Sequence, residues 1–275
     1  VASATPRIRV ADPVYNAQVI CEQAKEAAEH GAKIVVFPEL CITGYTCNDL
    51  FLQELLLEKA KEALLTIAEE TGQLETLFLV GLPVDKDGRL YNVAAVLYRG
   101  RILGMIPKKN IPMYAEFYEG RHFTPGEEKV TEYRLGKQVI PFGSNLLFRC
   151  EELPELILGC ELCEDLWVAE PPSTSHALMG ATVIANLSAS NETVSKDDYR
   201  TLLIKASSAR LLCGYIYTSA GEGESTQDLV FGGHDLIAEN GTLLVQSARF
   251  TTGILYTDLD VLKISSERRR CLLYT

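Results

Sequence analysis

The sequence contains no long apolar run and no signal-like start. No stretch reaches the roughly 18 consecutive apolar residues of a membrane-spanning helix, and the chain does not open with a basic segment followed by a short apolar one. We therefore expect a cytoplasmic protein without a membrane partner. With 275 residues, of which 47% are hydrophobic, the chain can bury a sizeable core.

Positive charge is scarce as well. Lysine and arginine total 26 residues against 37 aspartate and glutamate residues, so the formal net charge is -11. Nucleic acids and anionic membranes are bound by clustered cations, and neither is an expected partner here. The one dense basic run, at 267–270, is interpreted as a solvated helix or linker near the end of the sequence.

Internal repeats, low-complexity segments and long Gly/Ser linkers are also missing, which favours a single domain over residues 1–275. The eight cysteines are scattered along a large chain rather than concentrated in a small loop-rich one. Small disulfide-stapled proteins have the opposite pattern, so reduced thiols are expected.

Apolar runs of strand length alternate with segments of helical period, which predicts an α/β fold. Residues 89–108 form two such runs around an Arg-Gly turn at 99–100, so part of the sheet should be antiparallel and the sheet mixed. The loop from 107 to about 137 is long enough to suggest a functional role. Further strands are predicted at 33–40, 76–84, 155–160, 182–188 and 213–220, and residues 234–247 are predicted to form a hairpin around the Asn-Gly pair at 240–241. Helices are predicted at 12–32, 48–72, 173–180 and 196–213.

Two cysteines stand three residues apart, at 160 and 163. A zinc site would need a second ligand pair, and the nearest histidine, His176, has none, so no metal is expected. A redox pair is disfavoured because acidic residues between and after the thiols oppose thiolate formation. Cys160 lies within an apolar strand and is interpreted as a core residue. Cys163 lies just past that strand, where a nucleophile or a buried thiol could stand.

Glu39 and Lys108 occupy comparable positions, because each follows directly on an apolar strand. A thiol has an ordinary pKa of about 8.5 and needs a base or a nearby cation to attack at pH 7. We expect Glu39, Lys108 and Cys163 to converge at one edge of one sheet. Taken singly, Glu39 could be a helix or turn cap and Lys108 a surface lysine.

Five segments resemble the carbon-nitrogen hydrolase, or nitrilase, superfamily, and more closely the N-terminal glutaminase domains of glutamine-dependent NAD synthetases. The likeness runs from about residue 4 to the end of the chain. The segments are VVFPELCITGYTCNDLF (35–51), IPKKNIPMYAEFYEGRHFTPG (106–126), GCELCEDLW (159–167), ANLSASNE (185–192) and SAGEGESTQDLVFGGHDLIAENG (219–241).

The resemblance implies a nitrilase fold, which is a four-layer α-β-β-α sandwich, and hydrolysis of glutamine through a cysteine thioester. It assigns Glu39 as the base, Lys108 as the cation and Cys163 as the nucleophile, with Glu119 as a second acid in the catalytic set. No metal or organic cofactor is implied for this domain. The substrate-binding residues that it implies are Tyr114, Glu164, Ser188 and Ser190.

In that family the chain continues into an ATP-dependent synthetase domain with a Gly-rich SGGxDS loop, which this sequence lacks. The resemblance therefore implies that ATP and magnesium bind on an absent domain, which would make NAD from nicotinic acid adenine dinucleotide with the released ammonia. We expect an excised domain and a homo-oligomer. The alternatives are a stand-alone amidase for another small amide and a non-catalytic scaffold with a merely buried thiol.

Overall fold

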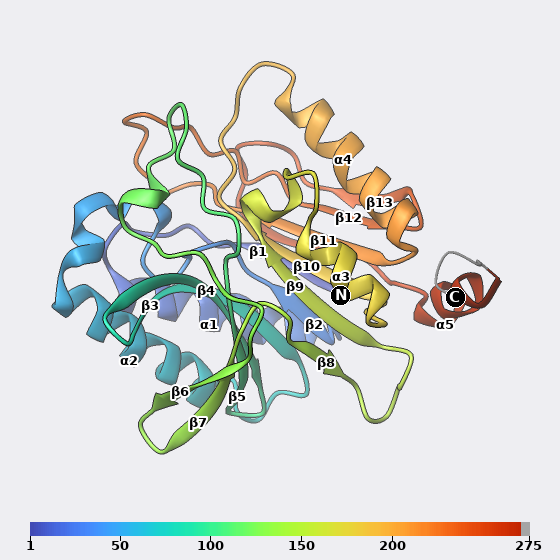
Figure 1. Cartoon of the computed structure of the whole chain (residues 1–275), viewed down its shortest axis with the longest axis horizontal. Helices are drawn as coiled ribbons and strands as arrows, with labels where there is room; N and C mark the ends of the chain where they lie inside the picture. Colours follow the sequence, from blue (N-terminus) through green and yellow to red (C-terminus); the bar gives the residue numbers. More distant parts are fainter. Residues whose placement is uncertain (271–275) are drawn as a thin grey trace.

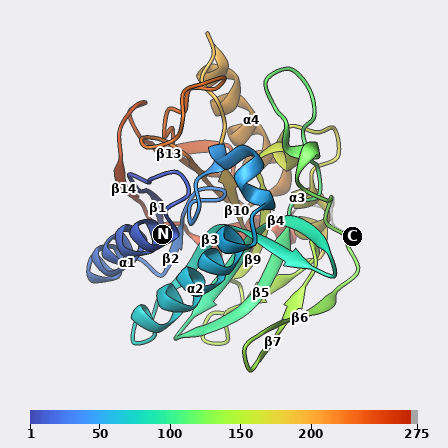
Figure 2. The same ribbon diagram turned by 90° about the vertical axis from the view of Figure 1, so that its left-hand side faces the viewer.

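Two β-sheets packed face to face form the centre of the molecule, as Figures 1 and 2 show for the computed structural model, which describes residues 1–270. The first sheet has eight strands, in the order β14-β1-β2-β3-β4-β5-β7-β6. Their bounds are β14 (Gly253–Tyr256), β1 (Ala2–Thr5), β2 (Ile34–Val36), β3 (Leu77–Lys86), β4 (Arg89–Tyr98), β5 (Arg101–Pro107), β7 (Gln138–Phe142) and β6 (Thr131–Leu135).

The second sheet has six strands, in the order β13-β12-β11-β10-β9-β8. Its central strands β9, β10 and β11 are parallel, whereas β8, β12 and β13 pair antiparallel to their neighbours. Both sheets are therefore mixed, as predicted. The bounds are β13 (Thr242–Gln246), β12 (Leu236–Glu239), β11 (Gly214–Ser219), β10 (Val183–Ser188), β9 (Ile157–Leu162) and β8 (Leu147–Arg149).

Helices cover the outer face of each sheet, which gives four layers. Helices α1 (Pro13–Glu29) and α2 (Glu54–Glu70) share one apolar core with the first sheet, and α3 (Pro172–Leu178) and α4 (Lys196–Leu211) share another with the second. A third core fills the space between the sheets, and it includes Cys160. The four-layer α-β-β-α sandwich and the core position of Cys160 are thus confirmed.

Helix α1 has the local sequence signals of a stable helix. Asp12 caps its first turn, accepting a hydrogen bond of 3.1 Å from the backbone N–H of Tyr15, and Pro13 occupies the first helical position. Beyond its end, Gly31 has a φ of +84°, a left-handed conformation that ends helices at low cost. Helix α5 (Val261–Arg270) follows the last strand and contains the basic run.

Two predicted segments differ from the structure. The helix expected over 48–72 begins only at Glu54, because Asn48 has non-helical φ and ψ of 49° and -132° and residues Tyr45–Leu52 form a separate 3-10 segment. The long loop expected to reach about 137 ends at β6, which forms an antiparallel hairpin with β7. The hairpin at 240–241 and the helices near 173–180 and 196–213 are confirmed. Within residues 1–270, no helix is both long and apolar enough to cross a bilayer.

Candidate active site

Three reactive side chains meet where strands of the two sheets end. Glu39 follows β2 and Lys108 follows β5, both in the first sheet, whereas Cys163 follows β9 in the second. The expectation that they share one sheet is wrong. An apolar run shows where a strand ends, but the sheet to which it belongs is decided by pairing with strands far away in the sequence.

Lys108 is the centre of a buried ion cluster. Its Nζ donates hydrogen bonds of 2.6 Å to Glu39 Oε1 and to Glu119 Oε1. The side chains of Lys108 and Glu39 are 0% exposed and that of Glu119 is 4% exposed. The structure therefore brings together the cation and both carboxylates that the sequence had singled out, and water does not screen their charges.

Neutral side chains fix the two carboxylates. Asn92 Nδ2 donates to Glu39 Oε1 at 2.7 Å and to Glu119 Oε2 at 3.4 Å, and the Tyr45 hydroxyl donates to Glu119 Oε1 at 2.9 Å. The backbone N–H of Ala189 donates to Glu39 Oε2 at 2.9 Å. Sequence reasoning missed Asn92 and Tyr45, since nothing near either residue in the chain links it to the cluster.

The electrostatics of the cluster follow from burial and from the one cation. Burial by itself would lower the pKa of Lys108, but the charges of Glu119 and Glu39 outweigh it and raise that pKa well above its usual value. Burial raises the pKa of Glu119 to about 7, although Lys108 opposes the shift. Burial also raises the pKa of Cys163, the charge of Glu39 raises it further, and the charge of Lys108 works against both. The resting thiol is therefore neutral.

A glycine in β3 makes room for the turn that carries Glu39. A Cβ atom at Gly81 would lie 2.2 Å from the backbone nitrogen of Leu40 and 2.6 Å from the carbonyl oxygen of Pro38. Both are backbone atoms, which cannot turn aside as a flexible side chain could. Only glycine lets this turn pack directly on β3 and direct Glu39 toward Lys108.

Cys163 stands at a strained position. Its φ is +40°, in the left-handed region that L-residues other than glycine rarely occupy, and it opens the 3-10 turn Cys163–Leu166. Such strain costs about 1–3 kcal/mol and persists only where the surroundings hold it, which is typical of functional sites. The side chain is nearly buried, with 6% of the residue exposed.

A cavity of about 430 Å³ opens beside Cys163, a volume suited to a small-molecule ligand. Tyr114 and Glu164 both line it, and the Tyr114 hydroxyl lies 3.1 Å from each carboxylate oxygen of Glu164. Burial raises the pKa of Glu164, while the hydrogen bond from Tyr114 opposes the shift. The structure therefore places Tyr114 and Glu164, which the resemblance implies as substrate-binding residues, in the wall of this cavity.

The two serines of the Asn-Leu-Ser-Ala-Ser segment have different positions. Ser190 lines the cavity, and its Oγ accepts a hydrogen bond of 3.3 Å from the fully buried Arg200. Ser188 is 0% exposed and is not part of the cavity wall; its Oγ donates to Asn186 Oδ1 at 2.7 Å. The structure thus brings Ser190 to the site, whereas the Ser188 hydroxyl belongs to the polar network of β10.

Lys196 is a cavity residue that sequence reasoning missed. It opens helix α4, its Nζ donates to Asn191 Oδ1, and it lies 5.2 Å from the centre of the Trp167 ring. Burial lowers its pKa. In the sequence, Lys196 precedes two aspartates at the start of a predicted helix, a pattern typical of solvent-exposed residues. No local signal therefore distinguished Lys196 from an ordinary surface lysine.

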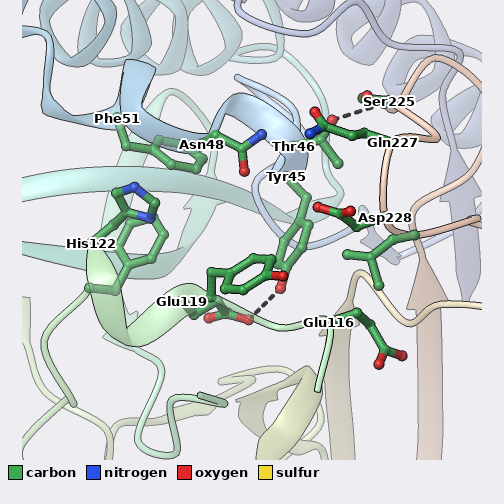
Figure 3. A pocket seen from close by; sticks show the side chains of 13 residues that line it. Tyr45, Thr46, Asn48, Phe51, Glu116, Glu119, His122, Ser225, Gln227 and Asp228 are labelled. Atoms are coloured by element: carbon green, nitrogen blue, oxygen red, sulfur yellow. Dashed lines mark hydrogen bonds between the residues drawn. The ribbon is translucent and has the colours of Figure 1, made fainter. Parts of the chain in front are cut away.

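A second, smaller cavity of about 40 Å³ reaches Glu119 but not Cys163. Figure 3 shows Glu119 and Tyr45 joined by their hydrogen bond, with Asn48, Gln227 and Asp228 around them. This volume holds only a few water molecules. The small fraction of Glu119 that is exposed therefore faces this second cavity.

The described residues offer no alternative centre for metal or disulfide chemistry. Within 1–270, no group of three or more His, Cys, Asp and Glu side chains is positioned to hold a metal ion. The seven cysteines in this part of the chain are all free; they are Cys21, Cys41, Cys47, Cys150, Cys160, Cys163 and Cys213. The reactive groups that the structure gathers at the site are a thiol, two carboxylates and an ammonium group.

Comparison with known sequences shows the family to which the chain is similar. The family model described as carbon-nitrogen hydrolase matches residues 1–269. A glutamine-dependent NAD(+) synthetase of Mycobacterium tuberculosis is 42% identical over 272 residues, which are 98% of this chain and 40% of that protein. One of Thermotoga maritima is 32% identical over 250 residues, covering 90% of this chain and 39% of that protein. The chain thus spans about two fifths of the length of these relatives.

Solved structures with the same fold support the family assignment made from sequence. A glutamine-dependent NAD(+) synthetase from Cytophaga hutchinsonii superposes with a TM-score of 0.85 and 29% identity, covering 94% of this chain and 42% of that one. An amidase from Nesterenkonia sp. superposes with a TM-score of 0.73 and 22% identity, covering 98% of this chain and 94% of that one, a likeness that concerns the fold alone. The chain therefore belongs to the carbon-nitrogen hydrolase family and is a domain that matches part of the glutamine-dependent NAD(+) synthetases.

Proposed function

We propose that this domain hydrolyses the side-chain amide of glutamine through a thioester on Cys163. The observation that carries the proposal is the buried Lys108 ammonium between Glu39 and Glu119, beside a thiol that opens into a ligand-sized cavity. The relatives that match 98% of the chain at 42% identity are named as glutamine-dependent enzymes, which supports glutamine over other small amides as the substrate.

In the first half-reaction, Cys163 Sγ bonds to the amide carbon as Glu39 takes the thiol proton. The negative charge that develops on the amide oxygen is stabilised by Lys108 and by the backbone N–H that follows Cys163. Glu39 then gives the proton to the amide nitrogen, the C–N bond breaks, and ammonia leaves. The product on the enzyme is a γ-glutamyl thioester.

In the second half-reaction, a water oxygen bonds to the thioester carbon as Glu39 takes its proton. The C–S bond breaks, the sulfur recovers the proton, and glutamate departs. Glu119, which shares Lys108 with Glu39, keeps that ammonium in place and helps to position the water. Every step uses groups of this chain and the water, so the mechanism needs no metal or organic cofactor.

The cavity carries charges that complement an amino acid. Glu164, with the Tyr114 hydroxyl, would accept hydrogen bonds from the α-ammonium group of glutamine. Lys196 and Ser190 would bind the α-carboxylate, and Lys196 is the only cation that lines this cavity within residues 1–270. A neutral amide without both charged groups would leave one of these side chains unpaired, which costs affinity.

We also propose that the ammonia serves a synthetase domain that uses ATP and magnesium to make NAD from nicotinic acid adenine dinucleotide. The support is that this chain covers only 40% of the NAD synthetases that it matches. Neutral ammonia is a nucleophile that water protonates, so delivery within one protein would protect it.

The direct test is ammonia release from glutamine by the 275-residue chain. Cys163→Ala should abolish release, whereas Cys160→Ala, which changes a buried cysteine within β9 three residues before Cys163, should leave the fold and most of the activity intact. Equal release by wild type and Cys163→Ala would remove Cys163 from the mechanism.

A panel of small amides assayed beside glutamine separates the alternatives. A preference of more than about tenfold for another amide, roughly 1.4 kcal/mol in transition-state binding, would make the protein a different amidase. Absence of turnover with every amide, together with protection of Cys163 from iodoacetamide, would support a non-catalytic scaffold.

A further inference from the structure

Asp165 is a buried carboxylate that no step of the proposed reaction uses. It lies in the turn that Cys163 opens, and 2% of the residue is exposed. Its Oδ2 accepts hydrogen bonds from the backbone N–H groups of Leu162 at 3.0 Å and of Lys109 at 3.4 Å. Its Oδ1 accepts from the backbone N–H and from the side-chain Nδ2 of Asn110, both at 2.8 Å.

These four hydrogen bonds join two chain segments that come from different sheets. Leu162 ends β9 and immediately precedes Cys163, whereas Lys109 and Asn110 immediately follow Lys108 at the end of β5. One carboxylate therefore connects the backbone next to the nucleophile with the backbone next to the cation.

The partners of Asp165 require the ionised form. All four groups are donors, so each oxygen must accept, and a protonated carboxyl group or an asparagine would direct a donor at a donor. Burial raises the pKa of Asp165 to about 6, while the N–H groups of Leu162 and Asn110 oppose the shift. At pH 7.5 the group is consequently ionised and can accept all four bonds.

We infer that Asp165 is a positioning residue that holds Lys108 and the strained Cys163 turn at the separation the reaction needs. The inference rests on the proposed glutamine hydrolysis. Cys163 keeps its left-handed backbone only if its neighbours fix it, and Asp165 fixes the residue just before it. The same carboxylate fixes the two residues just after Lys108.

This role affects turnover more than substrate binding. Lys108 and the N–H after Cys163 contact a charge that exists only in the transition state, and misplacement by about 1 Å can cost a factor of about 100. Ser190 and Lys196 would bind the α-carboxylate of the substrate. None of the four hydrogen bonds of Asp165 goes to the segments that contain these two residues. Loss of the carboxylate should therefore lower kcat and change KM little.

The experiment compares Asp165→Asn with Asp235→Asn in the 275-residue chain. Asp235 is an equally buried aspartate that accepts hydrogen bonds from Thr5 and from the backbone of Ser219, away from the cavity. Asp165→Asn should lower kcat for glutamine by about 10- to 100-fold, with KM changed by less than about threefold. Asp235→Asn should keep kcat within about twofold of the wild type.

A milder variant covers the case in which Asp165→Asn does not fold. Asn110→Ala removes one of the four hydrogen bonds and keeps the backbone ones, so kcat should fall by a few-fold with KM unchanged. An unchanged kcat in the folded variants would overturn the inference, and so would an equal loss of kcat in Asp235→Asn.

A second readout separates this inference from the proposed function. The rate of Cys163 alkylation by iodoacetamide, followed by intact mass, needs no substrate. It should change by more than about threefold in Asp165→Asn but not in Asp235→Asn. If wild type does not hydrolyse glutamine but the alkylation rates differ in this way, the substrate assignment fails and the positioning role stands. Identical alkylation rates and identical turnover would refute the positioning role.

Discussion

Replacing Lys108 with methionine tests the charge balance of the buried centre. Lys108 Nζ lies 2.6 Å from a carboxylate oxygen of Glu39 and of Glu119, and these side chains are 0% and 4% exposed. Methionine keeps a similar length without the charge, so Lys108→Met leaves two carboxylates buried with no cation. Breaking a buried pair in this way costs about 3–5 kcal/mol, which is the expected loss in the free energy of unfolding at pH 8.

The loss should become smaller as the pH falls. With its cation gone, Glu119 should have a pKa above the value of about 7 that it has beside Lys108. A carboxyl group whose folded-state pKa exceeds its unfolded value of about 4.3 destabilises the folded protein increasingly as the pH rises through that range. Lowering the pH from 8 to about 5.5 protonates the group in the variant and restores part of the lost free energy.

Urea denaturation at these two pH values measures the effect. The matched control is Lys109→Met, because Lys109 is the next residue but pairs with Glu128 at the surface, where such pairs contribute about 0–1 kcal/mol. The double variant Lys108→Met/Glu119→Gln buries a single carboxylate and should be more stable than Lys108→Met at pH 8. A stability loss independent of pH, or a double variant less stable than the single one, would refute the reasoning.

Three further predictions follow from the site and its surroundings. The wild-type kcat/KM should rise with pH as Glu119 loses its proton around its pKa of about 7, and Glu119→Gln should lose this pH dependence. If kcat/KM of Glu119→Gln still rises with pH as in the wild type, another group causes the dependence. Gly81→Ala should lower kcat by at least about tenfold, because its Cβ would meet the backbone at 2.2 Å; turnover within twofold of wild type would contradict this. Burial raises the pKa of Asp235 to about 7, so the wild type should lose stability relative to Asp235→Asn as the pH rises from about 4 to 7. If the free energies of unfolding of the two proteins change in parallel with pH, this prediction is wrong.

Much of the fold could be predicted because long apolar strands and amphipathic helices depend on local patterns. Strands β3, β4, β5, β9, β10 and β11 were all anticipated, and each is largely buried. Strand β6 was missed because its five residues, Thr-Glu-Tyr-Arg-Leu, are too few and too polar to form an apolar run. The start of α2 was misplaced because a backbone break at Asn48 has no strong sequence signal.

The residues of the site also fall into those that the sequence could indicate and those that it could not. Glu39, Lys108 and Cys163 could be singled out because each is a reactive residue that lies within three residues of the end of a strand. Asn92 could not, since it points at the carboxylates from the middle of a strand. Lys196 lines the cavity because the start of α4 lies near Trp167, with the Lys196 Nζ 5.2 Å from the centre of the ring. These contacts join residues far apart in the sequence, and one chain contains no local pattern that reports them.

The charges of the site are the reason that we propose a carboxylate as the activator of the Cys163 thiol, rather than an ion pair that keeps the sulfur as a thiolate. A cysteine beside a protonated histidine has a lowered pKa and can rest as a thiolate. Here the cation of the ion cluster is Lys108, and it is already paired with the carboxylates of Glu39 and Glu119. The pKa of Cys163 is accordingly raised by burial and by Glu39. A neutral thiol attacks an amide poorly, so in the proposed reaction its proton leaves as the S–C bond forms, and Glu39 is the base that we propose for this transfer.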